Sequence, residues 1–186
     1  MMENKEQIKE QAEEGVLRTY NRYPVVLDHG EGVYLYDTEG KKYLDFAAGI
    51  AVQALGYHYP GYDEALKAQI DKLMHTSNLY YNEPAARAAE KLVSLSGMSK
   101  VFFTNSGTEA IEGALKAARK YTYAKGRTDA YEIIAMNHSF HGRSMGALSV
   151  TGNEHYQIPF RPLVGGIRFA DYNDLESVRA QFSEHT

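Results

Sequence analysis

With 186 residues, 44% of them hydrophobic, the chain is long enough for one large globular domain or two small ones. Its formal net charge of −4 argues against a nucleic-acid-binding surface, and the absence of cysteine excludes disulfides and thiolate metal sites. We expect a cytoplasmic protein that binds neither nucleic acid nor a membrane, because no apolar stretch approaches the length of a membrane span.

The first part of the chain is predicted to form a polar helix, a three-stranded meander and two further helices. The charged segment 1–14 has no apolar core, so it is not a signal peptide, and we place a helix from Lys5 to Tyr20. Aromatic and β-branched runs separated by turn residues predict three antiparallel strands, over 25–27, 33–36 and 42–46, joined at 28–32 and 37–40. The following helices are predicted over 62–74, with Leu66, Ile70 and Leu73 on its apolar face, and from Pro84 to near Gly97.

The rest of the chain alternates between strands and helices. Short apolar runs predict strands over 101–104, 132–136 and 167–170, and a helix is expected from Gly107 to about Tyr121. Asn173 and Glu176 are predicted to cap a last helix that buries Leu175, Val178 and Phe182. Alternation of this kind is typical of an α/β fold with crossover connections. We place the arm, meander and first helix in residues 1–75, and the first part of a larger domain in residues 76–186.

A polar turn joins the predicted strand at 101–104 to the helix that follows. Ser106 and Glu109 form a capping box, so the helix should begin at Gly107 or Thr108. Such a turn offers backbone N–H groups, two hydroxyls and the positive end of a helix dipole, which together favour a phosphate. The alternative is a well-capped helix without a ligand. The sequence contains neither a Walker loop nor a dinucleotide-binding glycine motif.

A second candidate segment follows the strand at 132–136. Phe140 could stack on a planar ring, and Arg143 could hold a carboxylate through two charge-assisted hydrogen bonds. Ligands of open α/β sheets bind at this end of the strands. His138 and His141 have a spacing that can serve a metal, but no third ligand lies nearby, so we expect them to form loop hydrogen bonds and predict no metal site.

Four collinear segments now support a resemblance to a known family. Residues 105–119 (NSGTEAIEGALKAAR) and 138–143 (HSFHGR) resemble the phosphate-binding and cofactor-stacking segments of class III aminotransferases, which depend on pyridoxal phosphate (PLP). Residues 43–52 (YLDFAAGIAV) and 77–84 (SNLYYNEP) are similar to the acetylornithine aminotransferase branch of that family. Four separate motifs in the family's order are more specific than any one of them.

The resemblance implies a fold and a role for individual residues. It implies the PLP-dependent transferase fold type I, an α/β fold like that of aspartate aminotransferase, here as an incomplete large domain preceded by a small N-terminal α+β segment. Gly107 and Thr108, with Ser106 as cap, would hold the cofactor phosphate, and Phe140 would lie against its ring. Arg143 would bind the substrate α-carboxylate. The resemblance also places Tyr80 and Tyr81 in the substrate pocket, contributed partly across the interface of a homodimer.

The implied reaction moves an amino group from N-acetylornithine to 2-oxoglutarate in arginine biosynthesis. Relatives that use free ornithine carry a tyrosine at the position of Ile50, and an apolar residue there fits an acylated α-amino group. Three alternatives stay open at this point. One is another aminotransferase of the family, for ornithine, succinylornithine or 4-aminobutyrate; another is an aminomutase or decarboxylase relative; the third is a non-catalytic binding module.

The resemblance also shows what the chain lacks. In this family the lysine that forms a Schiff base with the cofactor, and the acid against the pyridine nitrogen, lie beyond the equivalent of residue 186. No lysine of this chain occurs in a matching context, so no catalytic residue is assigned. We therefore expect an N-terminal portion of an aminotransferase that is inactive and poorly soluble by itself.

Overall fold

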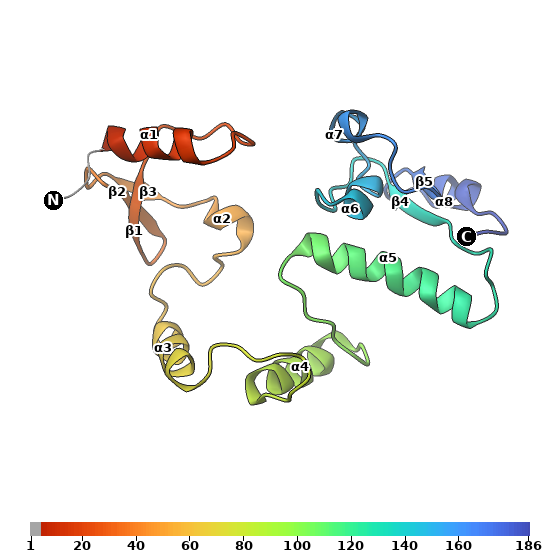
Figure 1. Ribbon diagram of the computed structural model, residues 1–186, viewed down its shortest axis with the longest axis horizontal. Helices are drawn as coiled ribbons and strands as arrows, with labels where there is room; N and C mark the ends of the chain where they lie inside the picture. Colours follow the sequence, from red (N-terminus) through yellow and green to blue (C-terminus); the bar gives the residue numbers. More distant parts are fainter. Residues whose placement is uncertain (1–4) are drawn as a thin grey trace. The chain divides into compact units, whose positions relative to one another are not determined.

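The computed structural model describes residues 5–186, which form two compact units, residues 5–82 and residues 83–186 (Figure 1). The boundary lies a few residues after the one predicted at 75/76. The assignment of the second part to a cofactor-binding domain stays a prediction.

The first unit is built around a three-stranded antiparallel sheet with strand order β1-β2-β3. Turn residues set its connections: Asp37 accepts hydrogen bonds from the backbone N–H groups of Glu39 and Lys41, which closes the turn between β2 and β3. The predicted meander is therefore confirmed. The elements are α1 (Lys5–Gly15), β1 (Leu27–Glu31), β2 (Tyr34–Asp37), β3 (Lys42–Leu44), α2 (Ala48–Ala51) and α3 (Tyr62–Lys72).

Two predicted boundaries in this unit are wrong. The first strand was predicted over 25–27, but β1 covers Leu27–Glu31, most of which was predicted as a turn. The chain reverses its direction after Gly32, at the end of that segment. That glycine has a φ of +57°, a left-handed conformation that favours glycine. Helix α1 ends at Gly15 rather than at Tyr20, because glycine is a poor helix former.

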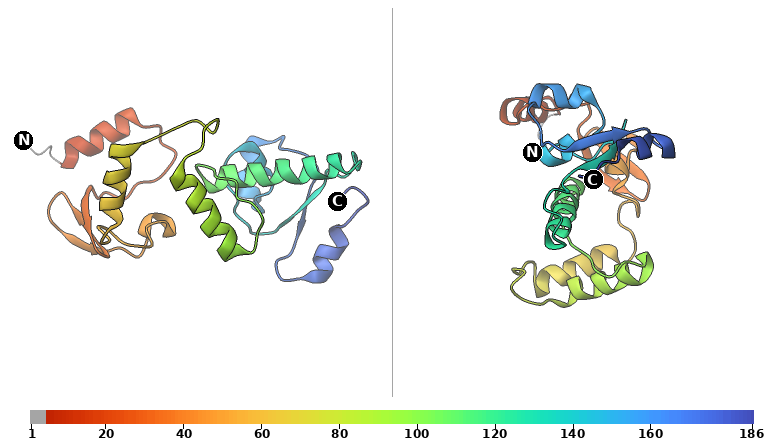
Figure 2. Two further views of the ribbon diagram at one scale, coloured as in Figure 1. Left: turned by 90° about the horizontal axis from the view of Figure 1, so that it is seen from below. Right: turned by 90° about the vertical axis from the view of Figure 1, so that its right-hand side faces the viewer.

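The second unit combines helices with a two-stranded parallel sheet, in which Ile133 of β4 pairs with Ile167 of β5 and Met136 with Ala170. The parallel pairing confirms the predicted crossover connection, and Figure 2 shows the helices around these strands. The elements are α4 (Glu83–Ser96), α5 (Gly107–Ala124), β4 (Ile133–Met136), α6 (Met145–Ser149), α7 (Glu154–Gln157), the short helix η1 (Ile158–Phe160), β5 (Ile167–Ala170) and α8 (Leu175–Gln181).

The strand predicted over 101–104 is absent. A strand needs a hydrogen-bonding neighbour, and no strand among residues 5–186 pairs with this segment. The ring of Phe102 lies instead beside α5, where a β-carbon added to Gly113 would come within 3.0 Å of Phe102 Cε1.

The last helix differs from its prediction in its cap and in its burial. Asp174, not Asn173, is the N-cap, and its Oδ1 accepts hydrogen bonds from the N–H groups of Glu176 and Ser177. Asn173 has a φ of +62°, whereas an N-cap needs an extended backbone. Leu175 and Phe182 are mostly exposed, so the predicted burial is wrong for both; the main contact of α8 is with β5.

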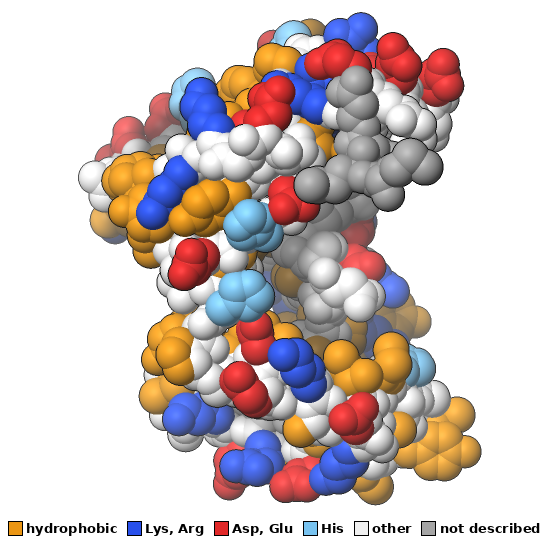
Figure 3. Space-filling model, turned by 90° about the vertical axis from the view of Figure 1, so that its left-hand side faces the viewer, with side chains coloured by type: hydrophobic (Ala, Val, Ile, Leu, Met, Phe, Trp, Pro, Cys, Tyr) orange, Lys and Arg blue, Asp and Glu red, His pale blue; other side chains and the backbone are white. Residues whose placement is uncertain are grey.

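The described residues bury few apolar side chains. The buried ones all belong to the second unit: Ala130, Ala135, Ala147, Leu148, Val150 and Ala170. Large apolar side chains are exposed in both units, among them Phe46, Ile50 and Phe102, and hydrophobic atoms appear at several places on the face that Figure 3 displays. None of the helices in residues 5–186 has the length and apolar character that crossing a membrane requires.

Candidate functional site: the start of α5 and the loop after β4

The start of α5 has the predicted capping box. Ser106 is the N-cap, and its Oγ accepts a hydrogen bond of 3.2 Å from the N–H of Glu109. The Glu109 carboxylate accepts in turn from the N–H of Asn105 at 2.7 Å, one residue earlier than in the usual box. Both interactions fix the direction in which the polar turn enters the helix.

Two backbone donors remain at this helix start. Within the described residues, the N–H groups of Gly107 and Thr108 have no hydrogen-bond acceptor. A β-carbon placed on Gly107 would meet nothing within 4 Å, so the first turn of α5 is uncovered on that side. Unpaired N–H groups, the Thr108 hydroxyl and the positive end of an 18-residue helix fit the phosphate of PLP.

The loop after β4 is shaped by contacts with the segment that follows α6. The N–H of His138 donates to the carbonyl of Gly152 at 2.7 Å, and the N–H of His141 donates to Thr151 Oγ1 at 3.0 Å. Thr151 is fully buried. The histidines therefore take part in loop structure through their backbones, and within residues 5–186 no three metal-binding side chains gather at one place.

Gly142 connects this loop to the start of α5. Its φ is +131°, and a β-carbon built on it would come within 2.2 Å of Thr108 Oγ1. Only glycine permits both this backbone conformation and this approach. The contact brings the two segments that the sequence singled out, around Thr108 and around Arg143, to one place.

Arg143 lies among aromatic rings at the surface. Its guanidinium carbon is 4.3 Å from the ring centre of Tyr156 and 5.6 Å from that of Phe140, and the two rings meet edge to face at 6.3 Å. No carboxylate within residues 5–186 pairs with Arg143, so its hydrogen-bond donors are available to a ligand. Phe140 is 61% exposed, which leaves its ring open for stacking.

Sequence reasoning missed Tyr156 and Glu112, because no local pattern marks either residue. Tyr156 belongs to α7, which follows the loop of Arg143 and α6 in the chain. Glu112 lies one turn after Thr108 on α5, and its Oε1 accepts hydrogen bonds from Ser144 Oγ at 2.5 Å and from the N–H of Ala147 at 3.1 Å. The Ser144 hydroxyl and these backbone donors lower the pKa of Glu112, with burial opposing them.

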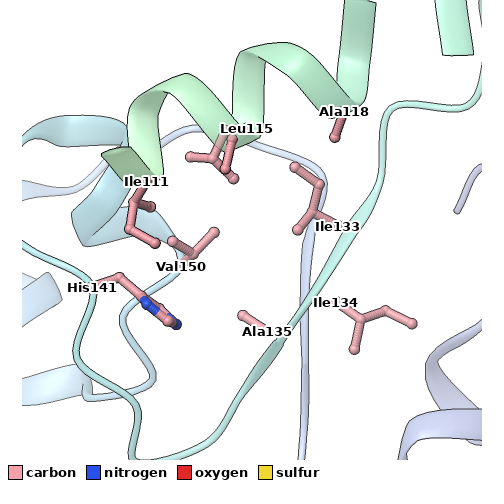
Figure 4. A pocket seen from close by; sticks show the side chains of 9 residues that line it. Ile111, Leu115, Ala118, Ile133, Ile134, Ala135, His141 and Val150 are labelled. Atoms are coloured by element: carbon pink, nitrogen blue, oxygen red, sulfur yellow. The ribbon is translucent and has the colours of Figure 1, made fainter. Parts of the chain in front are cut away.

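An open apolar cavity of about 270 Å³ lies between α5 and β4 (Figure 4). Ile111, Leu115 and Ala118 point from α5 toward the strand, as their helical spacing predicts. Ile133 and Ala135 of β4 line the opposite side. Its lining is almost entirely apolar, so this space suits packing side chains rather than a charged cofactor.

The structure thus brings together Ser106, Gly107, Thr108, Phe140 and Arg143 in one unit. Tyr80 and Tyr81 belong to the other unit, where both side chains are largely exposed. The binding roles of all seven residues stay predictions.

Comparison with known proteins identifies the family. The model of the aminotransferase class-III family matches residues 16–185, and the chain therefore belongs to this family. The acetylornithine aminotransferase of Clostridium acetobutylicum is 48% identical over 171 residues, which are 92% of this chain and 44% of that protein. A probable mitochondrial acetylornithine aminotransferase of Dictyostelium discoideum is 50% identical over 91% of this chain and 38% of its own length. The chain spans less than half the length of these relatives.

Solved structures show the same fold. An ornithine aminotransferase from Toxoplasma gondii ME49 superposes with a TM-score of 0.89 at 28% identity, covering 96% of this chain and 43% of that one. A second structure of the Toxoplasma gondii enzyme has partial occupancy of PLP at its active site. It superposes with a TM-score of 0.88 at 28% identity, covering 95% of this chain and 42% of that one. A Bacillus anthracis aminotransferase superposes with a TM-score of 0.84 at 29% identity, covering 94% of this chain and 40% of that one. The predicted fold class, a partial α/β unit of PLP-dependent transferase fold type I, is confirmed.

Proposed function

We propose that the complete protein is a PLP-dependent aminotransferase that moves an amino group from N-acetylornithine to 2-oxoglutarate, with this chain as its N-terminal part. The observation that carries the proposal is the contact between Gly142 and Thr108, which brings the segment of Arg143 against the first turn of α5. Relatives at 46–50% identity are named acetylornithine aminotransferases, which supports the choice of substrate.

Each site residue has a role in this proposal. The N–H groups of Gly107 and Thr108 and the Thr108 hydroxyl hold the cofactor phosphate, and Ser106 orients them by capping α5. Phe140 lies against the cofactor ring, and Arg143 binds the substrate α-carboxylate. When bound, PLP supplies the electron sink that transamination requires. Tyr80 and Tyr81 complete the substrate pocket. The homodimer, the cytoplasmic location and the place in arginine biosynthesis belong to the same proposal.

The runner-up is an ornithine aminotransferase, favoured by the structural likeness to the Toxoplasma gondii enzyme. Ile50 argues for the acetylated donor, because its side chain has no hydrogen-bonding group for a free α-amino group. Ile50 is 91% exposed in this chain, and its backbone has a φ of +65°.

The test uses the complete protein with PLP, assayed with N-acetylornithine, ornithine and 4-aminobutyrate as donors to 2-oxoglutarate. We expect the highest kcat/KM with N-acetylornithine, and a shift toward ornithine in Ile50→Tyr. A preference of the unaltered protein for ornithine would establish the runner-up instead. PLP binding without transamination of any of the donors would reject both.

A further inference from the structure

We propose that Glu112 is a positioning residue, which sets the place of Arg143 by fixing the backbone that follows it. The inference rests on the proposed function of Arg143 as the substrate carboxylate site. Glu112 touches neither substrate nor cofactor, and it acts through Ser144 and the first turn of α6.

The Glu112 carboxylate caps a helix to which it does not belong. Ser144 is the N-cap of α6, but its hydroxyl makes no capping hydrogen bond within its own helix. That hydroxyl donates to Glu112 Oε1 at 2.5 Å, and the N–H of Ala147, in the first turn of α6, donates to the same oxygen at 3.1 Å. The carboxylate of α5 therefore takes the place of the missing side-chain cap.

The backbone of α6 also approaches the second oxygen of the Glu112 carboxylate closely. A β-carbon built on Gly146 would come within 2.3 Å of Glu112 Oε2, so the buried Gly146 lets the backbone of α6 approach the carboxylate. The neighbouring donors hold the pKa of Glu112 below its usual range. The group is thus charged at neutral pH, and hydrogen bonds to a charged acceptor are the stronger kind.

Arg143 is held on both sides by the same helix. Gly142 before it lies against Thr108, and Ser144 after it is bonded to Glu112. Thr108 and Glu112 are one helical turn apart, so they present their side chains on one face of α5. The helix whose start is proposed to hold the cofactor phosphate thereby anchors the backbone on both sides of Arg143, and the guanidinium lies over the Tyr156 ring.

The test compares Glu112→Gln and Ser144→Ala in the complete, PLP-loaded protein, with Glu90→Gln on the exposed face of α4 as matched control. Glutamine keeps the shape of Glu112 but loses its charge, and alanine removes one donor. The first readout is the Kd of 2-oxoglutarate by calorimetry without an amino donor, so that no turnover occurs. The second is the KM and kcat for N-acetylornithine.

We expect each variant to raise the Kd and the KM by about five- to tenfold, less than the loss of a direct hydrogen bond between a charged group and the ligand, because the change reaches the ligand only through the backbone beside Arg143. The kcat and the PLP affinity should change by less than about twofold. Glu90→Gln should match the unaltered protein. Both substitutions break the same hydrogen bond between Ser144 and Glu112. The double variant should therefore raise the Kd no further than the more strongly affected single variant does.

The contrary results separate the two proposals. If Glu112→Gln and Ser144→Ala lower only the melting temperature, and leave Kd and KM unchanged, Glu112 is merely structural and the inference is wrong. If Glu112→Gln does not fold, the Kd and the KM of Ser144→Ala alone decide whether the inference holds. If Arg143→Ala also leaves the Kd of 2-oxoglutarate unchanged, the proposed role of Arg143 fails instead.

Discussion

The α-carbon of Gly142 lies directly against the side chain of Thr108. A β-carbon at Gly142 would come within 2.2 Å of Thr108 Oγ1 and 2.9 Å of its Cγ2, and the φ of +131° adds a second demand for glycine. Thr108 lies in the first turn of α5 and Gly142 in the loop after β4. The two candidate binding segments are therefore joined by one van der Waals contact that tolerates no larger residue.

Gly142→Ala should disturb both segments at once. The added methyl group clashes with Thr108, and the backbone conformation becomes strained, so we expect the complete protein to lose about 1–3 kcal/mol of unfolding free energy. PLP affinity should fall as well. Thermal unfolding and PLP titration measure the two effects. Gly165→Ala is the matched control, because a β-carbon there meets nothing within 4 Å; equal stability of the two variants would contradict the contact.

Thr108→Val tests the phosphate cradle. Valine keeps the shape of threonine but removes the hydroxyl, so PLP binding in the complete protein should weaken by ~1.5–3 kcal/mol, the value of one hydrogen bond to a charged group. The measurement is the PLP dissociation constant, from absorbance titration of the cofactor-free protein. Thr108→Ser keeps the hydroxyl and should retain most of the affinity. Unchanged affinity in Thr108→Val would argue against this assignment.

Arg143→Ala tests the carboxylate site. The KM for the amino donor should rise far more than the PLP dissociation constant, because the variant loses a carboxylate contact and no cofactor contact. Arg143→Lys should fall between alanine and arginine, since lysine keeps the charge but not the two-pronged geometry. Loss of the cofactor with unchanged donor kinetics would show that Arg143 has been assigned to the wrong partner.

The lowered pKa of Glu132 leads us to expect that the stability of the protein depends on pH. Its carboxylate accepts hydrogen bonds from Arg168 Nε at 2.8 Å and from Ser183 Oγ at 2.5 Å, and these partners lower its pKa. A lowered pKa in the folded state gives stability that is present above the unfolded value of about 4.3, and that is lost as the pH falls through the folded value. In the complete protein, the stability difference between the unaltered chain and Glu132→Gln should be constant above about pH 5.5 and shrink below about pH 4. Unfolding in denaturant at several pH values measures it, and a difference that grows in acid would contradict the prediction.

The 186-residue chain by itself should be poorly soluble and inactive as a transaminase. Phe46, Ile50 and Phe102 are 91%, 91% and 76% exposed, and β4 and β5 each have one strand edge without a partner among residues 5–186. Exposed apolar surface and open strand edges favour aggregation. Sedimentation and thermal melting of the purified chain test this. A monomeric, cooperatively melting chain that transaminates N-acetylornithine would contradict both parts.

Local signals in the sequence were sufficient for much of the fold. Ser106 and Glu109 located the start of α5, because a capping box involves only neighbouring residues. The helical spacing of Ile111, Leu115 and Ala118 puts them on one side of α5, and this is the side that faces β4. Gly107 and Thr108 were identified as binding candidates from the polar turn at the start of a helix, and Phe140 and Arg143 from the residue types after the strand at 132–136.

Tertiary structure alone decided which of these segments meet. Arg143 stacks on Tyr156, Glu112 binds Ser144 32 residues away, and Gly142 lies against Thr108, yet none of these pairs has a local pattern that announces it. The apolar run 101–104 has the composition of a strand and forms none, because a strand exists only where a neighbour supplies hydrogen bonds. Capping and periodicity depend on residues within one turn of each other, whereas the site depends on side chains that the folded backbone brings together.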